Sequence, residues 1–153
     1  GCARAKRRIM QEYRNHPIVQ GYIKANRFGE LLGMKFDVPS PGNVDYTMEV
    51  TEFHLATPIA AHGGSISALM DATMGVCALS QVISDNKVVS TIEMKISFVA
   101  PGLLGDVLSG TAEIVKTGKR ILFVEGKIVN QKGEIVAIAT GTFNSYPSEK
   151  AGF

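Results

Sequence analysis

The sequence predicts an α+β domain in which a curled, mainly antiparallel sheet of five to six strands wraps around one long buried helix, with further helices at the N-terminus. Two observations carry this prediction. First, β-type runs lie on both sides of a single long apolar segment, residues 64–84, and most of them follow it. Second, this segment is apolar around most of its circumference, so it is the element able to cover one face of the sheet.

The composition is typical of one globular domain. The chain has 153 residues, of which 45% are hydrophobic and 20% charged, close to globular averages. No uninterrupted apolar run reaches the roughly 18 residues of a membrane span, and the N-terminus does not resemble a signal peptide. Cys2 and Cys77 lie far apart without a C-x-x-C pair, which favours neither a disulfide framework nor a zinc site. We therefore expect a cytoplasmic protein.

The N-terminal segment predicts two helices and carries most of the charge imbalance. Residues 3–15 and 18–32 place apolar side chains at helical spacing, with Pro17 between them and Gly33 as a stop. The first helix takes its apolar face from Ile9, Met10 and Tyr13. Residues 1–27 hold seven Lys and Arg side chains against a single acid, a net charge of +6, in a chain whose overall charge is +2. We favour a solvated amphipathic helix; contact with nucleic acid, anionic lipid or a phosphate-bearing ligand is the alternative.

The remaining segments predict six strands. Residues 34–38 form a short strand, 39–42 a turn, and 43–51 a half-buried strand in which apolar and polar residues alternate. Residues 52–61 show no periodicity and are expected to be a loop. Four β-type runs follow the long helix, at 88–99, 107–116, 120–130 and 134–144, separated by turn signals at 101–102, 117–119 and 131–133.

The long helix 64–84 contains one residue that breaks its apolar pattern. Asp71 lies two turns into the helix, and buried carboxylates are uncommon and usually have a reason. Either it takes part in chemistry or it makes a structural hydrogen bond to a neighbouring loop. Ala68, Ala72 and Gly75 form a small-residue stripe that would let another element approach closely. Cys77 lies mid-helix without a flanking charge to activate it, so we expect a core residue.

Familiar catalytic and metal-binding motifs are missing from the sequence. It contains no G-x-S-x-G, H-E-x-x-H or G-x-x-x-x-G-K-[ST] pattern. His16, His54 and His62 show no metal-ligand spacing. We therefore expect neither a metal nor a cofactor.

A glycine pair at the start of the long helix, in His62-Gly63-Gly64, offers a different kind of site. Bare N–H groups at a helix N-terminus can bind a carbonyl oxygen that develops negative charge. Asp71, seven residues after Gly64, lies ~10 Å further along the helix, too far to act on the same carbonyl. If the domain pairs with a second copy of itself, Asp71 of one chain can face Gly63 of the other, and the two subunits build one site.

Two segments, HGGSISALMDATMG (62–75) and STIEMKISFVAPGLLGDVLSGTAEIVKTGKR (90–120), resemble the hotdog-fold acyl-CoA thioesterases. The most similar subgroup is the phenylacetate-pathway type within the 4-hydroxybenzoyl-CoA thioesterase superfamily. The resemblance covers residues 26–146, which it identifies as a hotdog thioesterase domain. It leaves 1–25 as a basic helical extension and 147–153 as a C-terminal tail. It implies a homodimer, with a dimer of dimers expected, and an acyl-CoA substrate without a cofactor, a nucleic-acid partner or a membrane span.

The resemblance also implies roles for individual residues. Asp71 would be the general base or nucleophile, the Gly63 N–H would polarise the thioester carbonyl, and Thr91 would help hold the attacking water. His62 is expected at the same catalytic centre, where it and Gly64 shape the turn. Substrate contacts are expected from Gly64, Ser90, Tyr146 and the hairpin residues Lys116, Gly118, Lys119 and Arg120, the last two as phosphate partners.

One position departs from the family pattern, and two other functions remain open. Many relatives have an Asn six residues before the histidine, where this chain has Ala56, with Thr57 beside it as a possible substitute. A hotdog-fold hydratase or dehydratase would need a histidine with a carboxylate, for which His54 is the candidate. A non-catalytic acyl-CoA binding or regulatory module is the alternative from another class. The sequence does not specify the acyl group.

Overall fold

The computed structural model describes the backbone of residues 1–153 and every side chain except those of residues 6–12. Its helices are α1 (Cys2–Asn15), α2 (Pro17–Ala25), α3 (Arg27–Leu31) and α4 (Gly63–Val82). Its strands are β1 (Lys35–Asp37), β2 (Asp45–Glu49), β3 (Lys87–Phe98), β4 (Val107–Thr117), β5 (Ile121–Val129) and β6 (Ile135–Pro147). Short 3₁₀ turns are η1 (Glu52–His54), η2 (Ile83–Asp85) and η3 (Ser148–Ala151).

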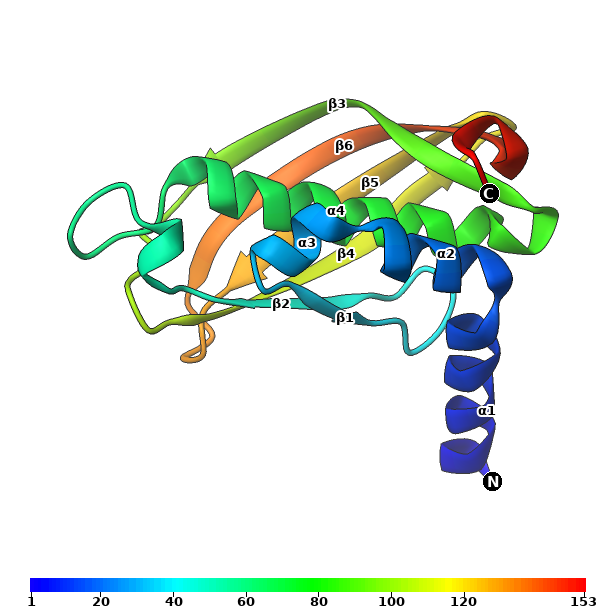
Figure 1. The fold of residues 1–153 in the computed structure, drawn as a ribbon, viewed down its shortest axis with the longest axis horizontal. Helices are drawn as coiled ribbons and strands as arrows, with labels where there is room; N and C mark the ends of the chain where they lie inside the picture. Colours follow the sequence, from blue (N-terminus) through cyan, green and yellow to red (C-terminus); the bar gives the residue numbers. More distant parts are fainter.

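The six strands form one antiparallel sheet that curls around α4, as the sequence predicts (Figure 1). Their order is β1-β2-β4-β5-β6-β3. The sheet therefore ends on one side with the three residues of β1 and on the other with the twelve residues of β3. A long unpaired edge strand presents a row of free backbone groups for another chain.

Helix α4 forms the centre of the core because it is apolar on nearly all sides. Ile66, Leu69, Met70, Thr73, Met74, Val76 and Cys77 are buried, as predicted. The sheet comes close to the helix at glycines: a Cβ on Gly110 would lie 2.2 Å from Thr73 Oγ1, and one on Gly126 would lie 2.6 Å from Met70 Sδ. With η2, the segment is long and apolar enough to cross a membrane by composition, but most of it is buried inside the domain. It is the core helix.

The prediction of a single helix over 18–32 is wrong in one respect, because the helix is interrupted at Asn26. Asn26 has a non-helical backbone, with φ −77° and ψ 63°, and its side chain accepts a hydrogen bond from Gly29 N at 3.2 Å. Asparagine is a favoured N-cap, since its side chain satisfies a free N–H of the next helix. The structure therefore has α2 and a separate short helix α3. Gly33 ends α3 with φ +71°, as predicted.

Helix α2 packs into the same core as the sheet. Its residues Ile18 and Val19 are 6% and 0% exposed. At the end of α1, Arg14 donates to the backbone of Phe36 and pairs with Asp37. The apolar positions predicted at Ile9 and Met10, and the basic cluster Lys6, Arg7 and Arg8, lie outside the residues whose side chains are described.

Other predicted boundaries differ slightly. Helix α4 begins at Gly63, one residue before the predicted start, because His62 acts as its cap. The half-buried strand is shorter than predicted, although Val44, Tyr46, Met48 and Val50 are buried on one face. The segment predicted as a loop contains η1 and a single bridge between Leu55 and Ala61.

Candidate active site

The carboxylate of Asp71 and the hydroxyl of Thr91 form a hydrogen-bonded pair. Asp71 lies near the middle of α4 and is half-buried, and Thr91 lies on β3. The Thr91 Oγ1 donates to Asp71 Oδ1 at 2.7 Å. A β-bulge lies immediately beyond, where β3 shifts its register against β6 between Thr91 and Glu93. Among the described residues no other group donates to Asp71, so its second oxygen is available to a bound molecule.

This pair lies in the wall of a cavity of about 220 Å³. The predicted site residues Asp71, Ser90, Thr91 and Tyr146 all contribute to the lining. The rest is mostly apolar and comes from both ends of the chain and from β3, β6 and α4: Ile18, Tyr22, Ala72, Gly75, Val76, Leu79, Val88, Val89, Phe143, Ala151 and Phe153. Ala72 and Gly75 of the small-residue stripe therefore leave room for this cavity.

The N-terminus of α4 presents a free N–H at Gly63. His62 Nδ1 accepts from Gly64 N at 2.7 Å, and the His62 N–H donates to the His54 carbonyl at 2.7 Å. No described residue accepts a hydrogen bond from the Gly63 N–H. The ring of Phe98 lies against this position, with its Cζ 3.3 Å from where a Gly63 Cβ would be. A free N–H at the positive end of a helix dipole can stabilise an oxyanion.

His62 is used as a helix cap. Because its Nδ1 accepts from Gly64, the ring proton of a neutral His62 is on Nε2. Its carbonyl also accepts from the Ser65 hydroxyl at 2.7 Å. These contacts fit the predicted role of shaping the turn.

Within one chain, Asp71 and Gly63 are separated by the length of the helix between them. Eight residues at 1.5 Å each give roughly 12 Å. Gly63 borders a different hollow, of about 350 Å³, together with Phe98 and Val99. The two halves of the predicted centre are therefore at different positions along β3: Asp71 beside Thr91, and Gly63 beside Phe98.

The predicted nucleotide-binding hairpin is a third, separate location. Lys116, Gly118, Lys119 and Arg120 are exposed at the turn between β4 and β5. Ser145 N donates to the Arg120 carbonyl at 2.6 Å, so the hairpin lies next to Tyr146 of the cavity wall. No described carboxylate is within ion-pair distance of Lys119 or Arg120, which leaves both charges available to an anion.

Three other polar groups singled out in the sequence are occupied by structural contacts. His54 is buried, accepts from Thr51 N at 2.9 Å through Nδ1, and contacts the Leu32 carbonyl at 2.8 Å through Nε2. No carboxylate is among these partners, unlike the arrangement expected of a hydratase. The Thr57 hydroxyl accepts from Ala60 N at 3.0 Å within its own turn. Burial, and then the charge of Glu113, raise the pKa of the Cys77 thiol to about 12, as suits a core residue.

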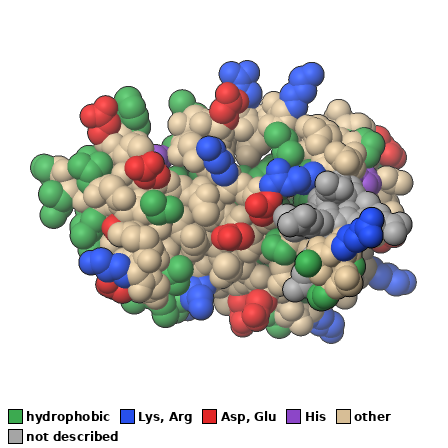
Figure 2. Space-filling model, turned by 90° about the horizontal axis from the view of Figure 1, so that it is seen from below, with side chains coloured by type: hydrophobic (Ala, Val, Ile, Leu, Met, Phe, Trp, Pro, Cys, Tyr) green, Lys and Arg blue, Asp and Glu red, His purple; other side chains and the backbone are tan. Residues whose placement is uncertain are grey.

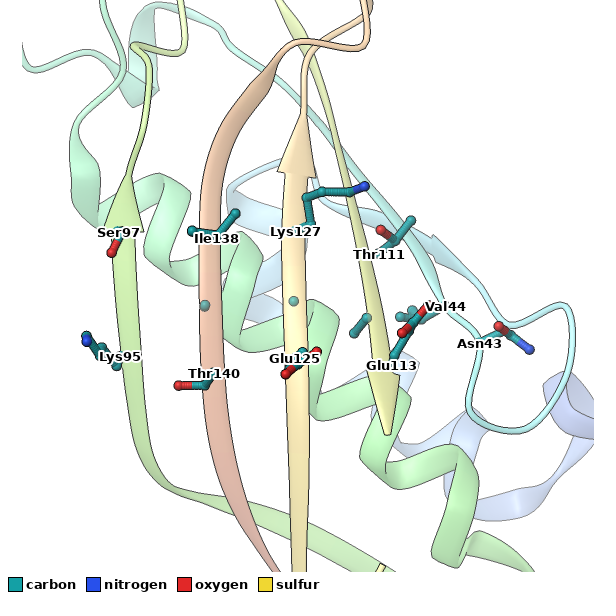
Figure 3. A pocket seen from close by; sticks show the side chains of 13 residues that line it. Asn43, Val44, Lys95, Ser97, Thr111, Glu113, Glu125, Lys127, Ile138 and Thr140 are labelled. Carbon is teal, nitrogen blue, oxygen red and sulfur yellow. The ribbon is translucent and has the colours of Figure 1, made fainter. Parts of the chain in front are cut away.

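Another hollow, of about 630 Å³, is on the opposite face of the sheet. Figure 3 shows Glu113, Glu125 and Lys127 of its lining on the side of the strands turned away from α4. Glu113 and Glu125 face each other there on β4 and β5, with Lys95 and Lys127 in the same hollow. None of the predicted site residues lines it, and Asp71 is on the other side of the sheet.

Several lining residues were not among the predicted site residues. Ile18 and Tyr22 come from α2 and Phe153 from the C-terminal tail, segments outside the resemblance to the thioesterases. Tyr22 also contacts Tyr46 through their hydroxyls at 3.3 Å, and Asn26 donates to both. Burial, and to a lesser degree the neighbouring Tyr46 and Asp71, raise the pKa of Tyr22. Its apolar position in a predicted helix was the available signal, and that pattern does not distinguish a cavity wall from a core.

Residues 60–137 match the family model described as Thioesterase superfamily. The chain belongs to this superfamily. It is 31% identical to the acyl-coenzyme A thioesterase PaaI of Escherichia coli over 110 residues, 72% of this chain and 76% of that enzyme. The predicted resemblance to thioesterases of the phenylacetate-pathway type is thereby confirmed.

Solved structures support the fold. The E. coli PaaI structure, from the phenylacetic acid degradation operon, aligns with a TM-score of 0.80 at 24% identity, over 90% of this chain and 96% of that one. This match confirms the predicted hotdog fold. A Streptococcus mutans protein solved bound to acetyl CoA aligns with a TM-score of 0.65 at 30% identity, over 71% of this chain and 84% of that one.

The described part of the chain holds no group of three or more His, Cys, Asp and Glu side chains placed to bind a metal ion. The polar groups that the structure places at the site are the Asp71 carboxylate, the Thr91 hydroxyl and the Gly63 N–H, beside a mainly apolar cavity.

Proposed function

We propose that this protein is an acyl-CoA thioesterase that hydrolyses its substrate to a carboxylic acid and free coenzyme A. The observation that carries the proposal is the hydrogen-bonded pair of Asp71 and Thr91 in the wall of a mostly apolar cavity. The cavity would take the acyl group and thereby bring the thioester carbonyl to the carboxylate. The relatives named as acyl-coenzyme A thioesterases support the same reaction.

In this reaction a water molecule attacks the thioester carbon while Asp71 takes its proton. Thr91, as donor to Oδ1, holds the carboxylate so that its second oxygen faces the water. The carbonyl electron pair moves to oxygen, and the Gly63 N–H of a partner subunit stabilises the resulting oxyanion. When the intermediate collapses, the carbon–sulfur bond breaks and the coenzyme A thiolate leaves with the proton from Asp71. Attack by Asp71 itself, followed by hydrolysis of the anhydride, is the nucleophilic variant of the same chemistry.

The site we propose is complete only in a dimer formed through β3. Asp71 lies beside Thr91 and Gly63 beside Phe98, seven positions apart on this edge strand. An antiparallel pairing of two β3 strands about an axis between these positions brings Asp71 of one subunit to the partner's Gly63. Two copies of the strand would also satisfy the free backbone groups of the edge.

The charges on β3 favour one register for this pairing. If Met94 faces the partner's Met94 on the axis, each Glu93 is opposite the partner's Lys95. If Lys95 instead of Met94 were on the axis, each Lys95 would lie opposite the partner's Lys95. Opposite charges across a strand pair stabilise it and like charges destabilise it. We therefore infer the register centred on Met94.

Exposed apolar side chains around Gly63 support burial against a second subunit. Phe53 is 87% exposed, Ile59 66%, Val99 57% and Leu104 52%. Leu104 N donates to the Ile59 carbonyl at 2.9 Å, which joins the two loops that carry these residues. Figure 2 shows hydrophobic side chains gathered at the left end of the molecule, where Figure 1 places the loop before α4. Exposed apolar patches of this kind mark interaction surfaces.

We further propose that Lys119 and Arg120 bind the phosphates of coenzyme A. Both are exposed at the β4–β5 hairpin, and this hairpin is hydrogen-bonded to β6 next to Tyr146 of the cavity. In the same proposal, residues 26–146 form the catalytic domain, the protein acts in the cytoplasm as a dimer of dimers, and no cofactor is needed.

The test is release of free thiol from a panel of acyl-CoAs by the wild type and by Asp71→Asn. We expect hydrolysis by the wild type and a loss of about 10²- to 10⁴-fold in the variant, as for removal of a general base. A circular dichroism spectrum checks that the variant is folded. Equal rates for a folded Asp71→Asn and the wild type would overturn the mechanism.

A further inference from the structure

We propose that the ring of Phe153 is the end wall of the acyl pocket and sets the longest acyl group that the protein accepts. This inference rests on the proposed function, because it assigns the cavity beside Asp71 to the acyl group. It goes further by naming the residue that limits the length of the pocket and the class of acyl groups that fits.

The cavity follows one face of α4 away from Asp71. Its helical lining residues are Asp71, Ala72, Gly75, Val76 and Leu79, which lie one turn after another. From Asp71 to Leu79 the helix rises about 12 Å. Asp71 and Thr91 are thus at one end, where we place the thioester, and in this proposal the acyl group extends from there toward Leu79.

Phe153 lies at the far end of this path. Figure 1 shows the C-terminus beside the C-terminal half of α4, and Phe153 lines the cavity together with Leu79 and Val88. The ring rests on α2 at Gly21: a Cβ there would lie 2.7 Å from Phe153 Cδ1. Glycine at this position therefore makes room for the ring between α2 and the cavity.

The backbone before Phe153 holds the ring in this place. Gly152 has φ +89°, a conformation that favours glycine, and it turns the chain back toward α2. Phe153 N donates to the Ser148 carbonyl at 3.3 Å. The side chain is 44% exposed, so it covers the cavity without being locked in the core. Its removal should lengthen the pocket at little cost to the fold.

The size of the cavity indicates the class of substrate. A cavity of ~150 Å³ in another protein accommodates benzene, and this one measures about 220 Å³. It therefore fits a medium-length acyl chain or a single ring on a short linker. A palmitoyl chain is too large, and it could enter only if Phe153 moved away.

The test compares Phe153→Ala with the wild type on hexanoyl-, octanoyl-, decanoyl-, phenylacetyl- and palmitoyl-CoA. We expect the ratio of kcat/KM for palmitoyl- over octanoyl-CoA to rise by about tenfold or more in Phe153→Ala, because each added methylene then gains apolar contact. Phe28→Ala is the matched control, since it removes a phenyl ring that is 61% exposed on α3 and does not line this cavity. Its ratio should equal that of the wild type.

A second variant tests the same wall from the other side. Gly21→Ala places a methyl group where the Phe153 ring lies, so it should displace the ring and raise the same ratio. In the double variant Gly21→Ala with Phe153→Ala no ring remains to be displaced, and the second change should add nothing further. If both single variants keep the wild-type ratio, the end wall is elsewhere.

Binding measurements separate this inference from the proposed reaction. Octyl- and hexadecyl-CoA thioethers cannot be hydrolysed, and their affinities can be measured by calorimetry on wild type and Phe153→Ala whether or not the protein is active. A gain of about tenfold for the hexadecyl thioether in Phe153→Ala, with the octyl thioether little changed, supports the wall even if hydrolysis fails. Equal affinities of both proteins for the hexadecyl thioether, or no binding of either thioether, would overturn it.

Discussion

Thr91 on β3 donates a 2.7 Å hydrogen bond to Asp71 on α4, and this contact fixes the orientation of a carboxylate in an otherwise apolar stretch of helix. The two residues are 20 positions apart in the sequence. Their contact requires that β3 return along α4 directly after the turn at η2. The geometry of the candidate site is therefore set by the same helix–strand packing that forms the core.

Thr91→Val should show whether Thr91 orients the Asp71 carboxylate or contributes to substrate binding. Valine keeps the shape of threonine but cannot donate to Asp71. Since a hydrogen bond to a charged group contributes about 1.5–3 kcal/mol, we expect kcat to fall roughly 10- to 100-fold with KM little changed. Thr91→Ser keeps the hydroxyl and should recover most of the rate. If Val and Ser variants are equally active, Thr91 does not act through its hydrogen bond.

His62 offers a test of capping against acid–base catalysis. Its Nδ1 caps α4 by accepting from Gly64 N. Asparagine is a good N-cap but not a general base, so His62→Asn should keep both stability and most of the activity. His62→Ala should lower the free energy of unfolding by about 0.5–2 kcal/mol. A drop of several orders of magnitude in kcat for His62→Asn, in a stable protein, would show that the imidazole takes part in the reaction.

The fold was predictable from the sequence because its signals are local. The alternation around Tyr46 and Met48, the turn residues between strands and the apolar helix each specify their own element. The break at Asn26 was missed because apolar spacing continues across it, while the capping bond to Gly29 depends on one backbone conformation. The glycine pair Gly63-Gly64 and Asp71, by contrast, could be singled out from the sequence, because they differ from the apolar residues around them.

The part of the cavity wall that comes from α2 and the C-terminal tail was not predictable, because it depends on contacts between distant segments of the chain. Phe153 touches Gly21, and Tyr22 touches Tyr46, across more than 20 residues in each case. Nothing in the sequence indicates that Gly21 and Phe153 are in contact. Only the structure shows that the ring of Phe153 lies against Gly21.

The buried thiol of Cys77 should resist alkylation in the native protein. With a pKa of about 12 instead of the usual value near 9, only about one in ten thousand of these thiols is ionised at pH 8. The exposed Cys2 provides an internal control. Iodoacetamide at pH 8 should modify Cys2 alone, and both cysteines after denaturation, as read by mass spectrometry of the peptides. Modification of Cys77 at the same rate as Cys2 would contradict its placement in the core.

The hairpin variant Lys119→Ala with Arg120→Ala should weaken the binding of coenzyme A thioesters. These side chains are exposed and pair with no described carboxylate, so their loss should leave the fold intact. We expect KM to rise about tenfold or more and kcat to change little. This pattern is expected when the bound substrate and the transition state lose the same binding energy.

A pantetheine thioester of the same acyl group is the control, because it lacks the nucleotide phosphates. Its KM should not change in the double variant. Equal losses on both substrates would show that the hairpin supports the reacting centre, and the phosphate site would then have to be sought at the basic N-terminal segment. Deletion of residues 1–15 tests that segment directly, and we expect it to have the smaller effect.

The proposed dimer register makes a charge-swap experiment decisive. In this register each Glu93 faces the partner's Lys95, twice by symmetry. Glu93→Lys places lysine opposite lysine, and Lys95→Glu places glutamate opposite glutamate, so each single variant should weaken the dimer roughly 10- to 100-fold. Sedimentation velocity across a concentration series measures this, and thiol release should fall in parallel, because Asp71 loses the partner's Gly63. The double variant Glu93→Lys with Lys95→Glu restores opposite charges and should restore both dimer and activity.

Glu125→Lys, on the outer sheet face away from the β3 edge, is the matched control and should leave the dimer intact. Glu93 also accepts a 2.7 Å hydrogen bond from Thr142, and this bond is lost in both variants in which Glu93 is replaced. Recovery in the double variant can therefore come only from the facing charges, whereas a double variant as weak as Glu93→Lys would mean that the strands pair in another register.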